Sequence, residues 1–122
     1  MWVGLDSAEF FERALRLNPR DPRIPFAQAG LAFAHVFSQR YEKAANMAAT
    51  ALRNMPHYPN AMLSSIAASA LAGRVEEARD TCSSYLKLNP AARISNSIDW
   101  GLHTPENAEM LAKAYRIAGM PE

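Results

Sequence analysis

Few residues of this chain have the types and spacing that metal binding or nucleophilic catalysis requires. The three histidines, His35, His57 and His103, share no i, i+4 or short-loop spacing with one another or with Cys82, the one cysteine. Zinc sites draw their ligands from such close pairs, so we predict no metal site. Cys82 falls within a helical apolar pattern with no histidine beside it, and we expect its thiol to be buried and unreactive.

The acidic residues do not suggest a catalytic pair either. Three carboxylates cluster at one expected helix start, where the helix dipole and two nearby arginines stabilise them (Glu76, Glu77 and Asp80, beside Arg74 and Arg79). Neither common type of glycine-rich phosphate loop occurs, and the five glycines are dispersed. We therefore predict that the segment is not an enzyme and binds no cofactor.

The charge pattern argues against nucleic acid as a partner. The formal net charge is +1, with 49% apolar and 20% charged residues, which is the profile of an ordinary globular protein. A strip of arginines near the N-terminus lacks interleaved aromatic residues and is offset by nearby carboxylates (Arg13, Arg16, Arg20 and Arg23, against Asp6, Glu9, Glu12 and Asp21). We predict no nucleic-acid binding by this segment.

Neither a membrane nor an oxidising compartment is indicated. The longest apolar run, residues 27–37, is interrupted by Gln28 and His35 and is well short of the roughly 20 residues of a membrane-spanning helix. The N-terminal residues lack the basic start of a secretory signal, and a single cysteine cannot form an intrachain disulfide. We expect a soluble, cytoplasmic protein with no membrane partner.

Internal repetition is the strongest feature of the chain. Residues 14–19, 51–56 and 85–90 align as Ala or Tyr, Leu, Arg or Lys, two further residues and Pro, and their starts lie 37 and then 34 residues apart. A second marker, Tyr-Glu-Lys-Ala at 41–44 and Val-Glu-Glu-Ala at 75–78, is again separated by 34 residues. Two markers with one period indicate a repeat protein.

The spacing between these markers is helical. Ala44, Ala48 and Ala51 fall at i, i+4 and i+7, and no strand-length alternation of apolar and polar residues occurs. The prolines after the markers end helices, and Gly73 suits a left-handed helix end. We predict an all-α fold of antiparallel helix pairs with about seven helices, over residues 6–17, 24–37, 41–54, 60–72, 75–88, about 94–101 and 105–118, the last of them capped by Thr104.

A 34-residue helix-turn-helix period that ends in proline resembles the tetratricopeptide repeat. In the first complete repeat the matching residues are Leu31, Ala32, Ala44, Ala51, Leu52 and Pro56, and the departures are Gln28, His35 and Ala48. In the second repeat the matches are Gly73, Ala78, Leu86 and Pro90, and the departures are Met62, Ser65, Ile66, Ser69 and Cys82. Small residues at Ala32, Ala44 and Ala78 suit helices that cross at close range.

The resemblance implies one tetratricopeptide-like α-solenoid domain over residues 1–122; an α-solenoid of another type is the alternative. Residues 6–19 are the second helix of a truncated repeat, 24–56 and 58–90 are complete repeats, and 93–122 form a degenerate C-terminal capping repeat. The closing residues 115–122 look like the tail of segments that end bacterial class III nucleotide cyclases or winged-helix transcription regulators. We therefore expect a larger signalling protein whose cyclase chemistry, where present, lies outside these residues.

The first helices of such repeats line a concave face, so the resemblance also implies a binding groove. Its expected lining is apolar: Phe26, Ala29, Phe33, Val36, Phe37, Leu63, Ala67 and Leu71. The expected ligand is an apolar peptide or amphipathic helix, from another protein or another domain of the same protein, with Phe33 and Phe37 as anchors. Some family members clamp a chaperone's C-terminal carboxylate there, but the corresponding places in this chain offer no cation (Ala29, Phe33, Leu63 and Ser64).

These observations favour a non-catalytic protein-interaction or regulatory module. In one alternative the same apolar residues are simply core, covered by the last helix or by a missing repeat. In a second, the segment stiffens or dimerises its parent protein, and the open helix face of Phe10, Phe11 and Leu15 completes the solenoid of a second copy in a homodimer. In a third, the chain is a stand-alone assembly or chaperone adaptor.

Overall fold

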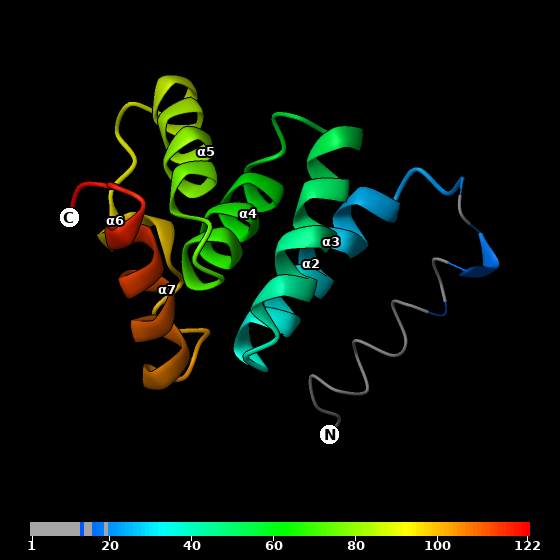
Figure 1. Cartoon of the computed structure of the whole chain (residues 1–122), viewed down its shortest axis with the longest axis horizontal. Coiled ribbons are helices and arrows are strands. Elements are labelled where there is room, and N and C mark those ends of the chain that lie inside the picture. The colour runs from blue at the N-terminus through cyan, green and yellow to red at the C-terminus, as the bar shows by residue number, and fades with distance from the viewer. Residues whose placement is uncertain (1–12, 14–15, 19) are drawn as a thin grey trace.

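The computed structural model of the chain describes residues 13, 16–18 and 20–122. These residues form six helices and no strand (Figure 1): α2 (Ile24–Phe37), α3 (Tyr41–Asn54), α4 (Pro59–Leu71), α5 (Val75–Leu88), α6 (Ile94–Ser97) and α7 (Pro105–Ile117). No helix in this described part is long and apolar enough to cross a membrane. The all-α prediction is confirmed for these residues.

The predicted helix boundaries agree closely with the structure. The ranges 24–37, 41–54 and 75–88 are confirmed to the residue, and the ranges 60–72 and 105–118 each end one residue beyond the observed helix. Prolines occupy the first turns of α2, α4 and α7, where a missing N–H costs no helical hydrogen bond. The Thr104 hydroxyl accepts from the Asn107 amide at 3.2 Å, which is the predicted cap.

Two predicted elements differ from the structure or lie outside it. The helix expected at about 94–101 is shorter, because Ile98 is extended and the carbonyl of Asp99 accepts from Leu102 and His103, which starts a turn. The helix expected at 6–17 lies mostly outside the described residues. The three residues of this range that the structure describes, Arg13, Arg16 and Leu17, are helical. The dimer face of Phe10, Phe11 and Leu15 lies entirely outside the described residues.

The same turn ends all three proline-started helices. Gln39, Gly73 and Gly119 have φ of 62°, 85° and 93°, and each lies fourteen residues after the first-turn proline of its helix (Pro25, Pro59 and Pro105). The residue after each one donates its backbone N–H to the carbonyl five residues earlier: Arg40 to His35 at 2.8 Å, Arg74 to Ser69 at 2.8 Å, and Met120 to Tyr115 at 3.0 Å. The three helices therefore end in the same C-terminal cap, a residue in the left-handed conformation followed by this hydrogen bond.

Substitutions in these turns should change stability in opposite directions. Gly73→Ala should lower the free energy of unfolding by about 1 kcal/mol, since the left-handed conformation is unfavourable for a residue with a Cβ. A Cβ at Gly73 would meet no atom within 4 Å, so backbone strain is the whole cause. Gln39→Gly should raise stability by a similar or smaller amount. Urea midpoints measure both, and changes of the same sign would contradict the shared turn.

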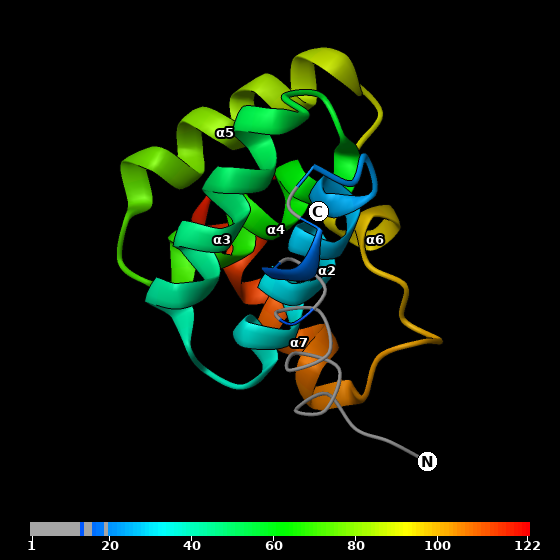
Figure 2. The same cartoon turned by 90° about the vertical axis from the view of Figure 1, so that its right-hand side faces the viewer.

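Helix α4 is the centre of the molecule. It packs against α2, α3, α5 and α7, and all ten residues from 61 to 70 are buried. Figure 2 shows α3 and α5 on one side of α4, with α2 and α7 on the other. Ala32, Ala44 and Ala78 are fully buried, as expected where helices approach closely.

Helix α7 does not continue the direction of the preceding first helices. Residues 89–104 carry the chain from the end of α5 back along the bundle, so that α7 runs opposite to α4 (Figure 1). A translated third copy of the helix pair would keep the direction of α2 and α4. Residues 93–122 therefore close the bundle with a reversed helix, which rests on α4 and contacts α5 and α6.

Candidate partner-binding surface

The residues with reactive side chains lie on different elements of the structure. His35 is buried in α2, His57 is exposed between α3 and α4, and His103 lies half-buried before α7. Cys82 is buried in α5, as predicted, and burial raises the pKa of its thiol. Among the described residues, no group of three histidine, cysteine or acidic side chains is arranged to hold a metal ion.

The charged residues form short-range surface pairs. Asp21 accepts hydrogen bonds from the guanidinium of Arg23, which lowers the pKa of Asp21 to about 2. The guanidinium of Arg74 joins two helices by donating to Glu42 of α3, and it also donates to Asn46 at 3.3 Å. Glu76 of α5 approaches Arg79. These pairs are solvated structural contacts of modest energy.

Half of the predicted groove residues belong to the core. Ala29, Val36, Leu63 and Ala67 are all buried, so the expectation that they line an open groove was wrong. For Leu63 and Ala67 the physical reason is the reversed helix α7, which packs on α4, together with Ile94 and Ile98 of the connecting segment, which join the same apolar cluster. Ala29 of α2 is instead buried in a second cluster with Ala51 of α3 and Ala61 of α4.

The other predicted groove residues are partly exposed to solvent. Phe33, Phe37 and Leu71 are partly buried against the core. Phe26 is 45% exposed and meets the ring of Tyr58 edge-on, with a centroid distance of 4.8 Å. The open part of the predicted groove is therefore confined to the aromatic side chains of α2 and to Leu71 at the end of α4.

A row of rings extends from α2 to the turn before α7. Phe33 and Phe37 stack with centroids 6.2 Å apart, and Phe37 lies 5.2 Å from His103. We call Phe33, Phe37 and His103 the aromatic row. Leu102, next to His103, is 75% exposed. Sequence reasoning missed His103 and Leu102, since nothing in the local spacing places residues of that turn beside α2.

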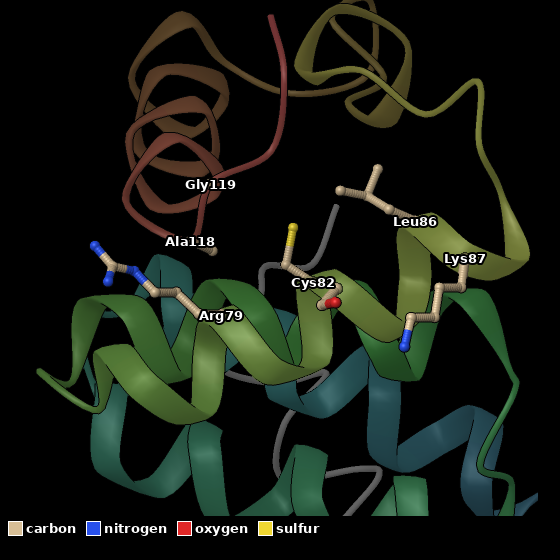
Figure 3. A pocket seen from close by; sticks show the side chains of 7 residues that line it. Arg79, Cys82, Leu86, Lys87, Ala118 and Gly119 are labelled. Atoms are coloured by element: carbon tan, nitrogen blue, oxygen red, sulfur yellow. The ribbon is translucent and has the colours of Figure 1, made fainter.

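A pocket of about 340 Å³ lies along the seam between α5 and the end of α7 (Figure 3). Its lining has two cations, a thiol, one leucine and three small residues: Arg79, Lys87, Cys82, Leu86, Ser83, Ala118 and Gly119. The sulfur of Cys82 points from α5 toward the end of α7 (Figure 3). Tyr115 of α7 is buried near Cys82 and Tyr85, and burial raises the pKa of its phenol.

The last residues fold back onto α6. The carbonyl of Pro121 accepts from the Ile94 amide at 2.7 Å, and the carbonyl of Glu122 accepts from the Ser95 amide at 3.2 Å. The Glu122 carboxylate also accepts from the Arg116 guanidinium at 2.7 Å and 3.1 Å, and the Met120 side chain is buried. These contacts hold α6 and the end of α7 together.

The buried phenol of Tyr115 predicts a loss of stability at alkaline pH. The folded pKa is raised above the ordinary value of 10.0, so the stabilising effect is complete below pH 10 and declines as pH rises through the folded pKa. Tyr115→Phe should therefore flatten the dependence of the urea midpoint on pH above 10. An unchanged slope in this variant would show that Tyr115 does not control the alkaline transition.

No protein-family model, curated protein or solved structure matches this chain.

Proposed function

We propose that this segment is a non-catalytic protein-interaction module that binds an apolar or helical segment of a partner through the aromatic side chains of α2. The aromatic row carries the proposal. Rings that remain partly exposed on a packed helix are typical of binding anchors, because they bury a large apolar area at little cost in side-chain entropy. Phe26, on the same helix as Phe33, and Leu102, next to His103, are also exposed.

The repeat pattern supports the same proposal. The 34-residue spacing of the two markers, the recurring turn at Gln39 and Gly73, and the sequential packing of α2 to α5 fit a tetratricopeptide-type solenoid. Proteins of that architecture use the inner face of their first helices for binding. We further propose that the module is part of a cytoplasmic bacterial signalling protein, either a nucleotide cyclase or a winged-helix transcription regulator, in which it binds a protein or another domain of the same chain.

A matched pair of variants tests the binding proposal. Phe33→Glu adds one negative charge to the aromatic row, and Ser84→Glu adds the same charge to an exposed site on α5, in the opposite layer. Captures from bacterial lysate should lose a specific partner about tenfold with Phe33→Glu, whereas Ser84→Glu should retain it, since charge in an apolar contact costs more than 1.4 kcal/mol. Circular dichroism checks that both variants are folded. Equal captures by both variants would refute the proposal.

A further inference from the structure

Helix α7 lies where a bound helix would lie. The inward side chains of α4, Leu63, Ala67 and Ala70, are buried in the same apolar cluster as the buried face of α7. Helix α7 packs against α4, and its own buried face is apolar (Ala108, Leu111, Ala112, Ala114 and Tyr115). Its opposite face is charged and exposed (Glu106, Glu109, Lys113 and Arg116). α7 is thus an amphipathic helix seated on the inner side of the repeat pair.

The turn before α7 also reaches the proposed binding surface. The ring of His103, two residues before α7, lies 5.2 Å from the ring of Phe37 of α2. The turn that leads into α7 therefore supplies one end of the aromatic row. A partner helix that contacted both α2 and α4 would need the space that the start of α7 occupies.

The attachment of α7 suits reversible release. Its chain connection to α5 runs through residues 89–104, which contain one four-residue helix. Helix α7 contacts α4 less extensively than α3 and α5 do, and four of the seven buried residues between Ala108 and Met120 are alanines. A pocket already separates part of α5 from the end of α7. Elements with few buried apolar contacts open at lower free energy than the central core.

We propose that α7 is an internal occupant of the partner site, and that the external partner is an amphipathic helix that carries the face pattern of α7 and replaces it. This inference rests on the proposed function and adds the class of ligand. The contact face of such a partner has small residues where α7 has Ala108 and Ala112, and larger ones where α7 has Leu111 and Tyr115. Binding therefore competes with closure of the molecule by its own last helix.

A reversible tether tests whether α7 must move. Ala118 and Cys82 line one pocket, and the sulfur of Cys82 points toward the end of α7 (Figure 3). In the variant Ala118→Cys, oxidation by diamide joins the two thiols and ties α7 to α5, with the two hydrogens transferred to diamide; dithiothreitol reverses the reaction. Ala118→Ser, which cannot form the tether, is the matched control under both conditions.

The probe is a labelled synthetic peptide of residues 104–120, followed by fluorescence anisotropy. We expect it to bind the wild type, the control and the reduced Ala118→Cys protein, and to bind the oxidised protein at least about tenfold more weakly, because the tether removes the open population. Equal binding to the oxidised and reduced forms, or no binding to any form, would overturn the inference.

Hydrogen exchange provides a test that does not depend on the disulfide. An isotopically heavy copy of the same peptide should accelerate exchange of the chain's own amides in 105–117 and leave α4 protected. Unchanged exchange in α7 at saturating peptide would contradict replacement. The two proposals also fail separately. A partner that depends on Phe33 but binds the tethered protein equally well would keep the proposed function and reject the role of α7.

Discussion

Ala67→Glu should abolish the cooperative thermal unfolding transition of this protein. Ala67 has no exposed surface and lies at the middle of α4, which is surrounded by four other helices. Burial of an unpaired carboxylate costs several kcal/mol, which is comparable with the roughly 5–15 kcal/mol of stability of a typical domain. Differential scanning calorimetry would detect the loss of the transition.

The matched control for Ala67→Glu lies on the same helix. Asn60 lies seven residues before Ala67 and is exposed in the first turn of α4, where a carboxylate interacts favourably with the helix dipole. Asn60→Glu should therefore leave the transition within a few degrees of the wild type. If the Ala67→Glu protein unfolded at the same temperature as this control, Ala67 would have to face an open groove, and its position in the core beneath the neighbouring helices would be refuted.

Tyr115→Ala should lower the free energy of unfolding by about 3–5 kcal/mol, the range found when large aromatic side chains are removed from a core. Tyr115 is the largest fully buried side chain among the described residues, and it joins α7 to the core cluster that contains Cys82 and Tyr85. Its loss leaves a cavity at the seam between α5 and α7. Urea denaturation measures the stability change.

The same variant should expose the thiol of Cys82. Cys82 is buried in the wild type, and loss of Tyr115 weakens the packing of α7 over it, so reaction with a thiol reagent under native conditions should become at least about tenfold faster. Lys113→Ala, on the exposed face of α7, should change neither stability nor thiol reactivity appreciably. A Tyr115→Ala protein that was destabilised but still protected Cys82 would show that α7 does not guard this thiol.

Local sequence signals were sufficient for most of the helices. Prolines at the first turns, the Thr104 cap and left-handed turn residues act over a few residues, and for that reason they predict helix ends without knowledge of the fold. The exception, the segment after Pro90, has a turn that begins at Asp99 and shortens the expected helix to Ile94–Ser97. The Asp99 carboxylate also accepts from the Leu102 amide at 3.2 Å. This side-chain hydrogen bond competes with the backbone hydrogen bonds of a helix, and helical periodicity does not reveal it.

The candidate binding surface was harder to predict. Helical spacing places Phe26, Phe33 and Phe37 on one side of α2, and these residues retain exposed surface. The same spacing grouped Leu63 and Ala67 on the inward side of α4, but it could not tell whether another element covers them. An apolar stripe that binds a ligand and one that binds the chain's own helix have the same composition, because both bury apolar area from water.

The order of residues thus specifies the helices, their caps and the pairing of neighbours, since these depend on contacts between residues close in the chain. It does not specify the direction of α7. That direction follows from the path of residues 89–104, from the contact between Phe37 and His103, and from the hydrogen bonds of Pro121 and Glu122 to the start of α6. Each of these contacts joins elements whose mutual positions exist only after the core around α4 has formed, and together they determine which part of the predicted groove stays open.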